Sequence, residues 1–378
     1  MSSGKMPPQH ILDGIRTWVE TESPTGHTAG VNAMMDLVEK EVAGLPVQVD
    51  RFAGRDGLGD IVVLRAGPDN GEKPVLLLSH LDTVHPVGTL ESDLPWQIDG
   101  DRLYGPGVFD MKASAYIALQ AFRQTVFDVS LKRPLIYLFS PDEEVGSPST
   151  RPLIEELARQ AAYVLVTEPG REGGKVITSR KGVGWFEVLV EGRPAHSGSS
   201  HKDGASAIRE AARQILEIEG MTDYQRGVTT NVGTIAGGSA GNVVPEYCRF
   251  SIDLRINSMA EGGEYERRIR ELKPHDPNTR LFVEGEINRP PFERHEGVEK
   301  LYEIIRETGL EIGQTIEELP RCGGASDGNF TAALGVPTVD GLGVDGAGGH
   351  TLHEYIELSS IEPRRALLMR LLERLAGK

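Results

Sequence analysis

Continuous apolar runs and helical spacing alternate along the first half of this chain. The runs PVLLLSH (74–80), RPLIYLFS (133–140) and AYVLVTE (162–168) are separated by stretches whose apolar positions recur with the period of a helix. Continuous apolar strands between helices are typical of an α/β sheet that is covered on both faces. We therefore expect residues 1–179 to form the first part of an α/β domain.

The pattern changes in the middle of the chain. GWFEVLVEG and CRFSIDLRI alternate apolar and polar residues, as half-exposed antiparallel strands do, and helical stretches lie between and after them. The order strand, helix, strand, strand, helix, strand predicts a small α+β domain over 180–291. The first pattern returns over 292–378, so the small domain is inserted into the larger one. A chain of 378 residues is long enough for two domains.

Composition and charge argue against nucleic acid and anionic membranes as partners. The chain is 39% hydrophobic and 25% charged, and its net charge is −16. An acidic chain is a poor candidate for binding nucleic acid or anionic lipid through its overall field. Two cysteines far apart in sequence form neither a disulfide framework nor a cysteine metal site. We find no signal-peptide pattern or transmembrane-length apolar run, and we expect a cytoplasmic protein without nucleic-acid or membrane partners.

Potential metal ligands gather after the predicted strands of the α/β domain and in two glycine-rich loops. These residues are His80, Asp82, Asp110, Glu143, Glu144, Glu168, His350 and His353. Ligands of open α/β sheets bind beyond the carboxyl ends of the strands. Histidine and carboxylate together suit Zn²⁺ and similar cations, and cations would remove the repulsion between neighbouring carboxylates.

Each of these fragments also has a structural explanation. A His-x-Asp pair after a strand is more often a hydrogen-bonded structural pair, and a pair of glutamates is usually a solvated face. Asp110 could cap the helix that follows it, and Glu168 before a proline could be a turn residue. The joint pattern, repeated at four successive places and followed by a late histidine in a glycine-rich loop, favours the metal site.

With these motifs the sequence resembles the di-zinc amidohydrolase and exopeptidase family, which includes bacterial glutamate carboxypeptidase, succinyl-diaminopimelate desuccinylase, acetylornithine deacetylase, aminoacylase and tripeptidase. The resemblance covers nearly the whole chain and is greatest to glutamate carboxypeptidase. It rests on SHLDTV, GPGVFDMKAS, SPDEEVGS, TEPG, GRPAHSG, GNVVPEYCRFSIDLR, CGGASDGNF and GHTLHEYIEL. The family fold is a zinc-exopeptidase-like α/β catalytic domain with an inserted, ferredoxin-like α+β lid that dimerises. The resemblance thus implies a homodimer formed through the inserted domain.

The resemblance also implies two Zn²⁺ ions, for which Co²⁺ or Mn²⁺ are possible substitutes. His80 and Glu168 match the ligands of one zinc. Glu144 and His350 match the ligands of the other. Asp110 matches the carboxylate that bridges the two.

The spacing of the last family motif decides between two histidines. In the family, the ligand commonly lies about four residues before a glutamate that is followed by an aromatic or small residue. His350 lies four residues before Glu354, which is followed by a tyrosine. We therefore prefer His350 and interpret His353 as a surface or neighbouring residue.

Two residues match catalytic positions of the family. Asp82 matches the carboxylate that orients His80, since a metal-bound histidine usually needs such a partner. Glu143 matches the general base, which takes a proton from water activated by the metals and passes it to the leaving amine.

Three residues of the inserted domain match positions that hold the substrate. His196 matches a histidine that reaches the active site of the partner subunit. Asn242 and Arg255 match positions that bind a substrate carboxylate, a task that suits the planar fork of arginine. Taken alone, His196 would be an ordinary surface residue and Arg255 part of a surface salt bridge.

The expected reaction is hydrolysis of an amide or peptide bond next to a free carboxylate, with release of a C-terminal amino acid. The substrate would be a small peptide or an N-acyl amino acid. The main alternative is an N-acyl-amino-acid deacylase or aminoacylase. Glu168 argues against the di- and tripeptidase branches, which tend to carry aspartate there.

Two other classes of protein fit the sequence less well. A binding or scaffold protein that has lost catalysis would be expected to lack ligands or the base, and all of them are present. A two-metal phosphatase would share the metals but would not explain the inserted domain with His196.

Overall fold

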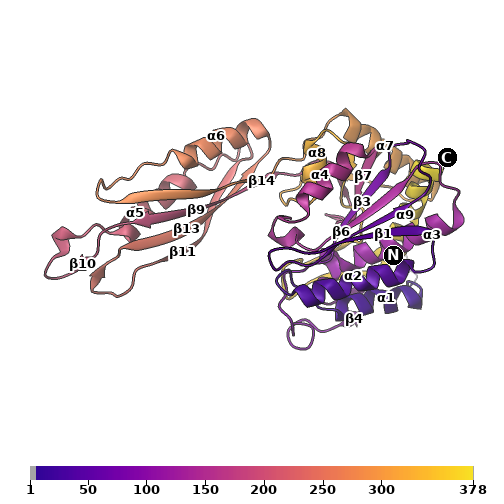
Figure 1. The fold of residues 1–378 in the computed structure, drawn as a ribbon, viewed down its shortest axis with the longest axis horizontal. Coiled ribbons are helices and arrows are strands. Elements are labelled where there is room, and N and C mark those ends of the chain that lie inside the picture. Colours follow the sequence, from indigo (N-terminus) through magenta and orange to yellow (C-terminus); the bar gives the residue numbers. More distant parts are fainter. Residues whose placement is uncertain (1–5, 378) are drawn as a thin grey trace. The chain divides into compact units, whose positions relative to one another are not determined.

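The computed structural model describes residues 6–377, which divide into two compact units. The larger unit comprises the chain up to Ser179, Arg294–Cys322 and the residues from Ser326 onward; the smaller comprises Arg180–Glu293 and Gly323–Ala325. Figure 1 labels many of the elements of both. The predicted fold class, an α/β unit with an inserted α+β unit, is confirmed.

A six-stranded sheet forms the centre of the larger unit. Its order is β1 (Val47–Phe52), β2 (Ile61–Ala66), β6 (Leu135–Ser140), β3 (Val75–His80), β7 (Tyr163–Val166) and β16 (Thr338–Val339). The last four strands are parallel, and β1 and β2 pair antiparallel at one edge. Every residue of β3 and β6 is buried, as their continuous apolar sequences predict.

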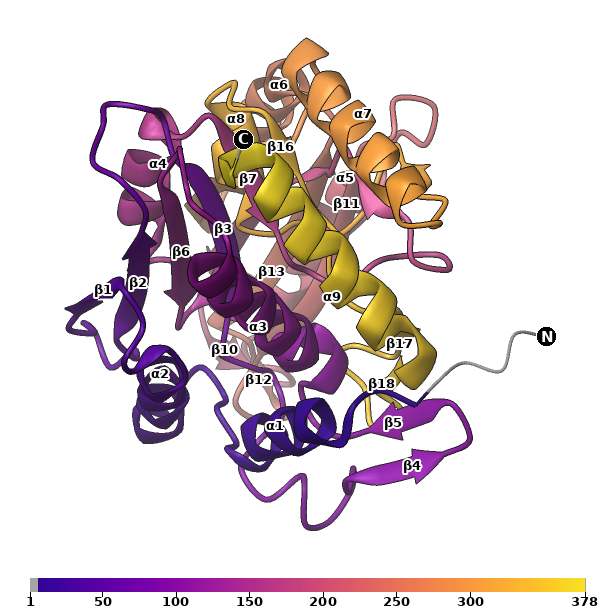
Figure 2. The ribbon, with the colours of Figure 1, turned by 90° about the vertical axis from the view of Figure 1, so that its right-hand side faces the viewer.

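Helices cover both faces of this sheet (Figure 2). One face packs against α4 (Arg151–Gln160) and α8 (Gly328–Ala333), where alternate strand residues such as Leu76 and Leu138 join one apolar cluster with Ile154 and Phe330. The larger unit also contains the helices α1 (Gln9–Glu20), α2 (Thr28–Val42), α3 (Ala113–Asp128), α7 (Glu296–Glu311) and α9 (Leu358–Leu372). Helices on both faces account for the complete burial of β3 and β6.

A second, four-stranded sheet of the larger unit was not anticipated from the sequence. Its order is β17 (Gly346–Ala347), β18 (Tyr355–Glu357), β5 (Arg102–Tyr104) and β4 (Gln97–Asp99). Strands of two or three residues are too short to show a hydrophobic period. The pairing of Ile356 with Leu103 brings the late glycine-rich loop beside the segment that leads to α3. A further short pair joins β8 (Val176–Ile177) and β15 (Glu318–Leu319).

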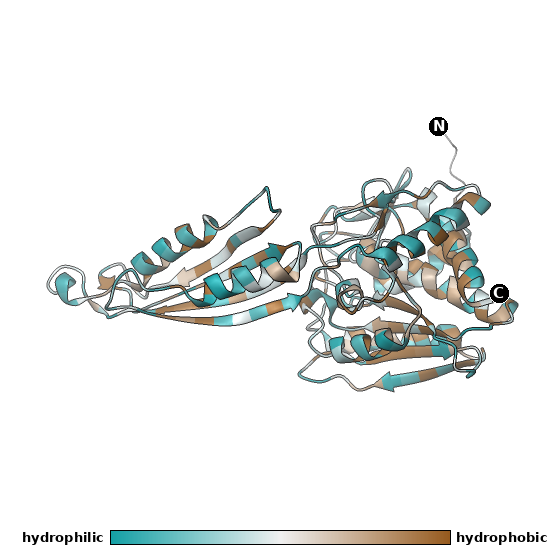
Figure 3. Cartoon of the chain, turned by 90° about the horizontal axis from the view of Figure 1, so that it is seen from above, coloured by the Kyte–Doolittle hydropathy of each residue, from teal (hydrophilic) through white to brown (hydrophobic). Residues whose placement is uncertain are grey.

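The smaller unit has the order β-α-β-β-α-β. Its antiparallel sheet runs β11 (Thr229–Gly237), β13 (Tyr247–Ile256), β9 (Gly182–Glu191) and β14 (Arg280–Arg289), a ferredoxin-like arrangement. Helices α5 (Ala207–Glu219) and α6 (Met259–Arg270) share one apolar core with alternate strand residues. A short pair joins β10 (Ala195–His196) to β12 (Val243–Val244). In Figure 3 hydrophobic and hydrophilic stretches alternate along these helices. Within residues 6–377, no helix has the length and apolar character needed to cross a membrane.

Candidate metal centre

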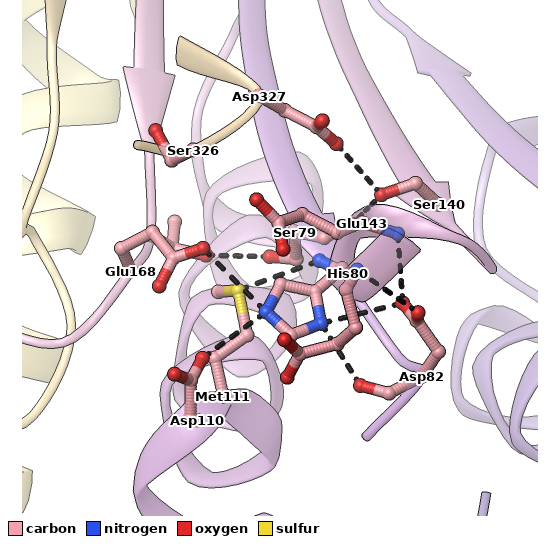
Figure 4. Close-up of polar contacts among 12 residues, drawn as sticks. Ser79, His80, Asp82, Asp110, Met111, Ser140, Glu143, Glu168, Ser326 and Asp327 are labelled. Carbon is pink, nitrogen blue, oxygen red and sulfur yellow. Dashed lines mark hydrogen bonds and ion pairs between the residues drawn. The ribbon is translucent and has the colours of Figure 1, made fainter. Parts of the chain in front are cut away.

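Three of the predicted ligands meet because β6, β3 and β7 are parallel neighbours. His80 is the last residue of β3, Glu168 follows β7, and Glu144 lies in the short helical turn Glu143–Val145 after β6. The carboxyl ends of parallel neighbours share one edge of the sheet, so the three side chains converge there (Figure 4 shows His80 and Glu168).

Asp110 and His350 reach the same place from other elements. Asp110 lies in the helical turn Val108–Lys112 directly before α3, and not at the end of a strand of the main sheet. His350 lies in the loop between β17 and β18 and has a left-handed backbone, with φ of 65°. The second sheet holds the two segments together, which the sequence pattern could not reveal.

The carboxylate of Asp110 lies between two His–Glu pairs. Its Oδ1 is 3.2 Å from His80 Nε2, which lies 3.5 Å from Glu168 Oε1. Its Oδ2 is 3.4 Å from His350 Nε2, which lies 3.2 Å from Glu144 Oε2. One carboxylate therefore presents one oxygen to each pair.

These separations fit a pair of tetrahedral cation sites. Zinc bonds of about 2.0–2.2 Å place neighbouring ligand atoms of a tetrahedral site roughly 3.3–3.6 Å apart. Three residues, His80, Asp110 and Glu144, offer ligand atoms that all lie within 4.8 Å of one another. The buried Glu144 Oε1 also has no hydrogen-bond partner among the residues that the structure describes. A cation would satisfy this oxygen.

The pKa shifts of the cluster also favour positive charge near its carboxylates. Burial and the nearby charge of Asp110 raise the pKa of Glu168 well above its usual value, and the pKa of Glu144 is raised mainly by burial. Burial opposes the charge of His80, but its contacts with Asp110 and Asp82 raise its pKa well above the usual value. These raised pKa values indicate that positive charge near the carboxylates would stabilise the cluster.

Asp82 is fully buried and contacts both His80 and the Glu143–Glu144 turn. The Nδ1–H of His80 donates to the main-chain carbonyl of Asp82 at 2.9 Å, while the Asp82 carboxylate lies 3.4 Å from Nδ1. This bond leaves Nε2 as the ring nitrogen for a cation. The carboxylate accepts the N–H groups of Glu143 (3.1 Å) and Glu144 (3.2 Å) and the hydroxyl of Thr25 (2.7 Å).

Glu143 is half-buried and lies beside His80. Its charge contributes to the raised pKa of both His80 and Glu168, and Figure 4 shows its side chain next to the His80 ring. Glu144, the next residue, points instead to His350. A carboxylate beside the ligands is placed where a general base must be.

The structure brings two of the predicted substrate-binding residues together within the smaller unit. His196 is exposed on β10, where its Nδ1 accepts the N–H groups of Gly198 and Ser199, and the main-chain carbonyl of Asn242 accepts the N–H of Ser197 at 2.9 Å.

Arg255 lies elsewhere in the same unit. It is near the end of β13, about 26 Å along the strand from Tyr247, the first residue of β13, which follows the β10–β12 pair closely in sequence. Its Nε and Nη2 each lie 2.7 Å from an oxygen of Asp253.

Residues beyond the predicted set hold this site in place. Thr25 binds the carboxylate of Asp82, and Glu354 binds His85 and the turn that carries Asp110. Sequence reasoning used Glu354 only to choose between two histidines. Its position in HTLHEY was the signal that could have identified it.

Histidines and carboxylates around one shared carboxylate are typical of hydrolases that use divalent cations. Residues 76–374 match the model of Peptidase family M20/M25/M40, and the chain belongs to this family. Carboxypeptidase G2 from Pseudomonas sp. (strain RS-16) is 30% identical over 378 residues, which cover 97% of this chain and 90% of that protein. An acetylornithine deacetylase from Myxococcus xanthus is 32% identical over 229 residues, 57% of this chain and 58% of that protein.

A solved structure shows the same fold. The M20 family metallo-carboxypeptidase Sso-CP2 from Sulfolobus solfataricus has a TM-score of 0.77 at 16% identity, covering 96% of this chain and 98% of its own. The chain is therefore a hydrolase of the metal-dependent peptidase and amidohydrolase class.

Proposed function

We propose that this protein is a two-zinc hydrolase that cleaves an amide or peptide bond next to a free carboxylate, as a glutamate carboxypeptidase does. The observation that supports this most directly is the position of Asp110, whose two oxygens lie 3.2 and 3.4 Å from the histidines of two His–Glu pairs. The similarity to carboxypeptidase G2 over 97% of the chain supports the carboxypeptidase class.

The residues divide the chemical work between them. His80 and Glu168 would hold one cation, His350 and Glu144 the other, and Asp110 both. When bound, the cations polarise the scissile carbonyl and make water more acidic. Glu143 takes a proton from the attacking water and delivers it to the leaving nitrogen. Asp82 keeps the base in position through the N–H of Glu143 and fixes the His80 ring through its own main-chain carbonyl.

A second candidate is an N-acyl-amino-acid deacylase, and the similarity to acetylornithine deacetylase favours it. Both activities require a carboxylate beside the scissile amide, and they differ in the group on the carbonyl side. A carboxypeptidase would cleave peptidyl or folate-like substrates, whereas a deacylase would cleave acetyl or longer acyl groups. The group that the enzyme accepts on the carbonyl side of the amide therefore distinguishes the two activities.

The test is an assay of zinc-loaded protein on an amide library, read by the released amino acid, together with metal analysis. We expect about two zinc ions per chain, activity that a chelator removes, and release of acidic residues from peptidyl or folate-like substrates. Release only from acyl groups would favour the deacylase. Full activity in protein without metal would overturn the two-zinc proposal.

We also propose that the smaller unit forms a homodimer. Helix α5 exposes Ile208 and Leu216, which is 75% exposed, and it packs beside β11, an edge strand on which Ile235 is 54% exposed. An open strand edge next to exposed apolar side chains suits pairing with a second copy. In such a dimer His196 would bind the substrate of the partner subunit, while Asn242 and Arg255 stay candidates for binding the substrate carboxylate.

A further inference from the structure

Glu354 is a fully buried carboxylate whose four hydrogen bonds all reach other segments of the chain. Its Oε1 accepts the N–H groups of Phe109 at 2.8 Å and Asp110 at 2.9 Å. Its Oε2 accepts the N–H of Gly107 at 3.0 Å and lies 2.7 Å from Nε2 of His85. A charge is buried at this depth only when such bonds replace its hydration.

These bonds join the three segments that supply most of the candidate ligands. Glu354 follows His350 by four residues in the loop before β18, and it binds the turn that carries Asp110. His85 lies in the loop that continues from His80. The three N–H groups lie at the start of the helical turn Val108–Lys112, where the first donors of a helix have no internal partners. Glu354 supplies the missing acceptors.

We infer that Glu354 is a positioning residue, which sets the place of the Asp110 carboxylate between the two His–Glu pairs and thereby the affinity for both cations. This inference rests on the proposed two-cation site. Because Asp110 donates its own N–H to Glu354, a shift of this bond moves the residue that both cations would share. Replacing a residue that orients a metal ligand typically lowers metal affinity about 10–100-fold.

The critical variant is Glu354→Gln. A glutamine has nearly the same size but only one acceptor oxygen, so its NH₂ group must face at least one of the donors that the carboxylate now binds. We expect Glu354→Gln to bind Zn²⁺ about 10–100-fold more weakly in a chelator-competition titration. We also expect its Co²⁺-loaded form to have a changed visible absorption spectrum, since that spectrum reports the arrangement of the ligands.

Glu210 offers a matched control in the smaller unit. It is also a buried glutamate, and its carboxylate accepts the N–H groups of His275 at 2.9 Å and Asp276 at 3.0 Å. Glu210→Gln should lower the unfolding temperature yet leave the zinc affinity and the cobalt spectrum unchanged. The comparison separates a general loss of stability from a displaced ligand.

A second variant keeps the inference testable if Glu354→Gln does not fold. Glu354→Asp retains the negative charge but moves the carboxylate one methylene closer to the backbone. It should weaken zinc binding by a smaller factor than Glu354→Gln does. Zinc affinity and cobalt spectrum equal to those of the unchanged protein, in whichever variant folds, would overturn the inference. If the unchanged protein itself bound no stoichiometric metal, the proposed function would fail instead.

Discussion

Glu143 and Glu144 show how two neighbouring residues come to differ in role. The Asp82 carboxylate accepts both of their N–H groups, which fixes the backbone of the turn. From this turn Glu144 contacts His350 at 3.2 Å, while Glu143 lies beside His80. In the proposed mechanism, one carboxylate is thus a ligand and the other is left for proton transfer.

Substituting each glutamate in turn should separate these roles. Glu143→Gln keeps the size of the side chain and removes its proton acceptor, so we expect unchanged zinc content and a kcat lowered about 100-fold or more. Glu144→Gln should instead lower the zinc content. Metal analysis and steady-state kinetics of both variants check this, and near-normal turnover of Glu143→Gln would show that it is not the base.

We expect Lys112 to make the stability of the metal-free protein depend on pH. Its amine is buried and donates to the carbonyl of Thr21 at 2.7 Å, and burial lowers its pKa from 10.5 to about 7. Because the unfolded chain binds this proton more tightly, the folded state gains stability as pH rises from about 7 to 10.5. The contribution approaches about 1.4 kcal/mol per pH unit. Urea unfolding of chelator-treated protein should show a flatter pH dependence for Lys112→Met; equal slopes would contradict this account.

Arg255 has two explanations that one pair of variants distinguishes. If it binds the substrate carboxylate, Arg255→Ala should lower kcat/KM by about tenfold or more on free-acid substrates and little on their amides. Asp253→Asn releases the guanidinium from its present ion pair and should leave KM unchanged or lower. Equal losses from both variants, on acids and amides alike, would show a structural salt bridge.

At the scale of elements, hydrophobic pattern predicted the long strands and helices and missed the short ones. The buried runs that became β3, β6 and β7 have a clear pattern, because both of their faces are covered. Strands β5, β17 and β18 have only two or three residues each, and they are strands only because they pair with one another. For this reason the sequence pattern placed Asp110 in a glycine-rich loop with the other candidate ligands but did not reveal the short sheet that holds this loop beside them.

The turn before α3 tolerates little change at Gly107. This residue has φ of 68°, and a Cβ there would lie 2.4 Å from Cγ2 of Thr83. Gly107→Ala should therefore destabilise the protein and weaken zinc binding, because the displaced turn carries Asp110. Gly57→Ala is the control, since Gly57 also has a positive φ, of 81°, but no atom within 4 Å of a Cβ. It should cost about 1 kcal/mol of stability and leave zinc affinity unchanged, measured by unfolding and chelator competition.

At the scale of the whole molecule, the proposed dimer predicts complementation between inactive variants. Glu143→Gln lacks the base and His196→Ala lacks the residue proposed to serve the partner subunit. Mixing the two proteins should restore part of the activity as subunits exchange, because each heterodimer contains one intact site. Each variant alone, incubated in the same way, is the control. A stable monomer with full activity in sedimentation would rule out the arrangement.

Family motifs located the candidate ligands but not the contacts that hold them. The residues expected to bind cations follow strands or lie in glycine-rich loops, and such positions can be recognised in one sequence. The bond between Glu354 and Gly107 joins residues 247 positions apart, and the bond between Thr25 and Asp82 joins residues 57 positions apart. No local pattern carries such information, because it arises only when the sheet edges come together.

The order of the candidate ligands along the chain affects how the protein is made. His80, Asp110, Glu144 and Glu168 lie in the first 168 residues, whereas His350 follows the whole of Arg180–Glu293. At about 5–20 residues per second, a ribosome needs roughly 10–35 seconds for the intervening stretch of about 180 residues. In the proposed arrangement, the set with His80 and Glu168 is synthesised first, and the set with His350 is complete only near the end of translation. Because Glu354, which binds the turn that carries Asp110, is also made near the end, we expect both cation sets to reach full affinity only when translation is almost complete.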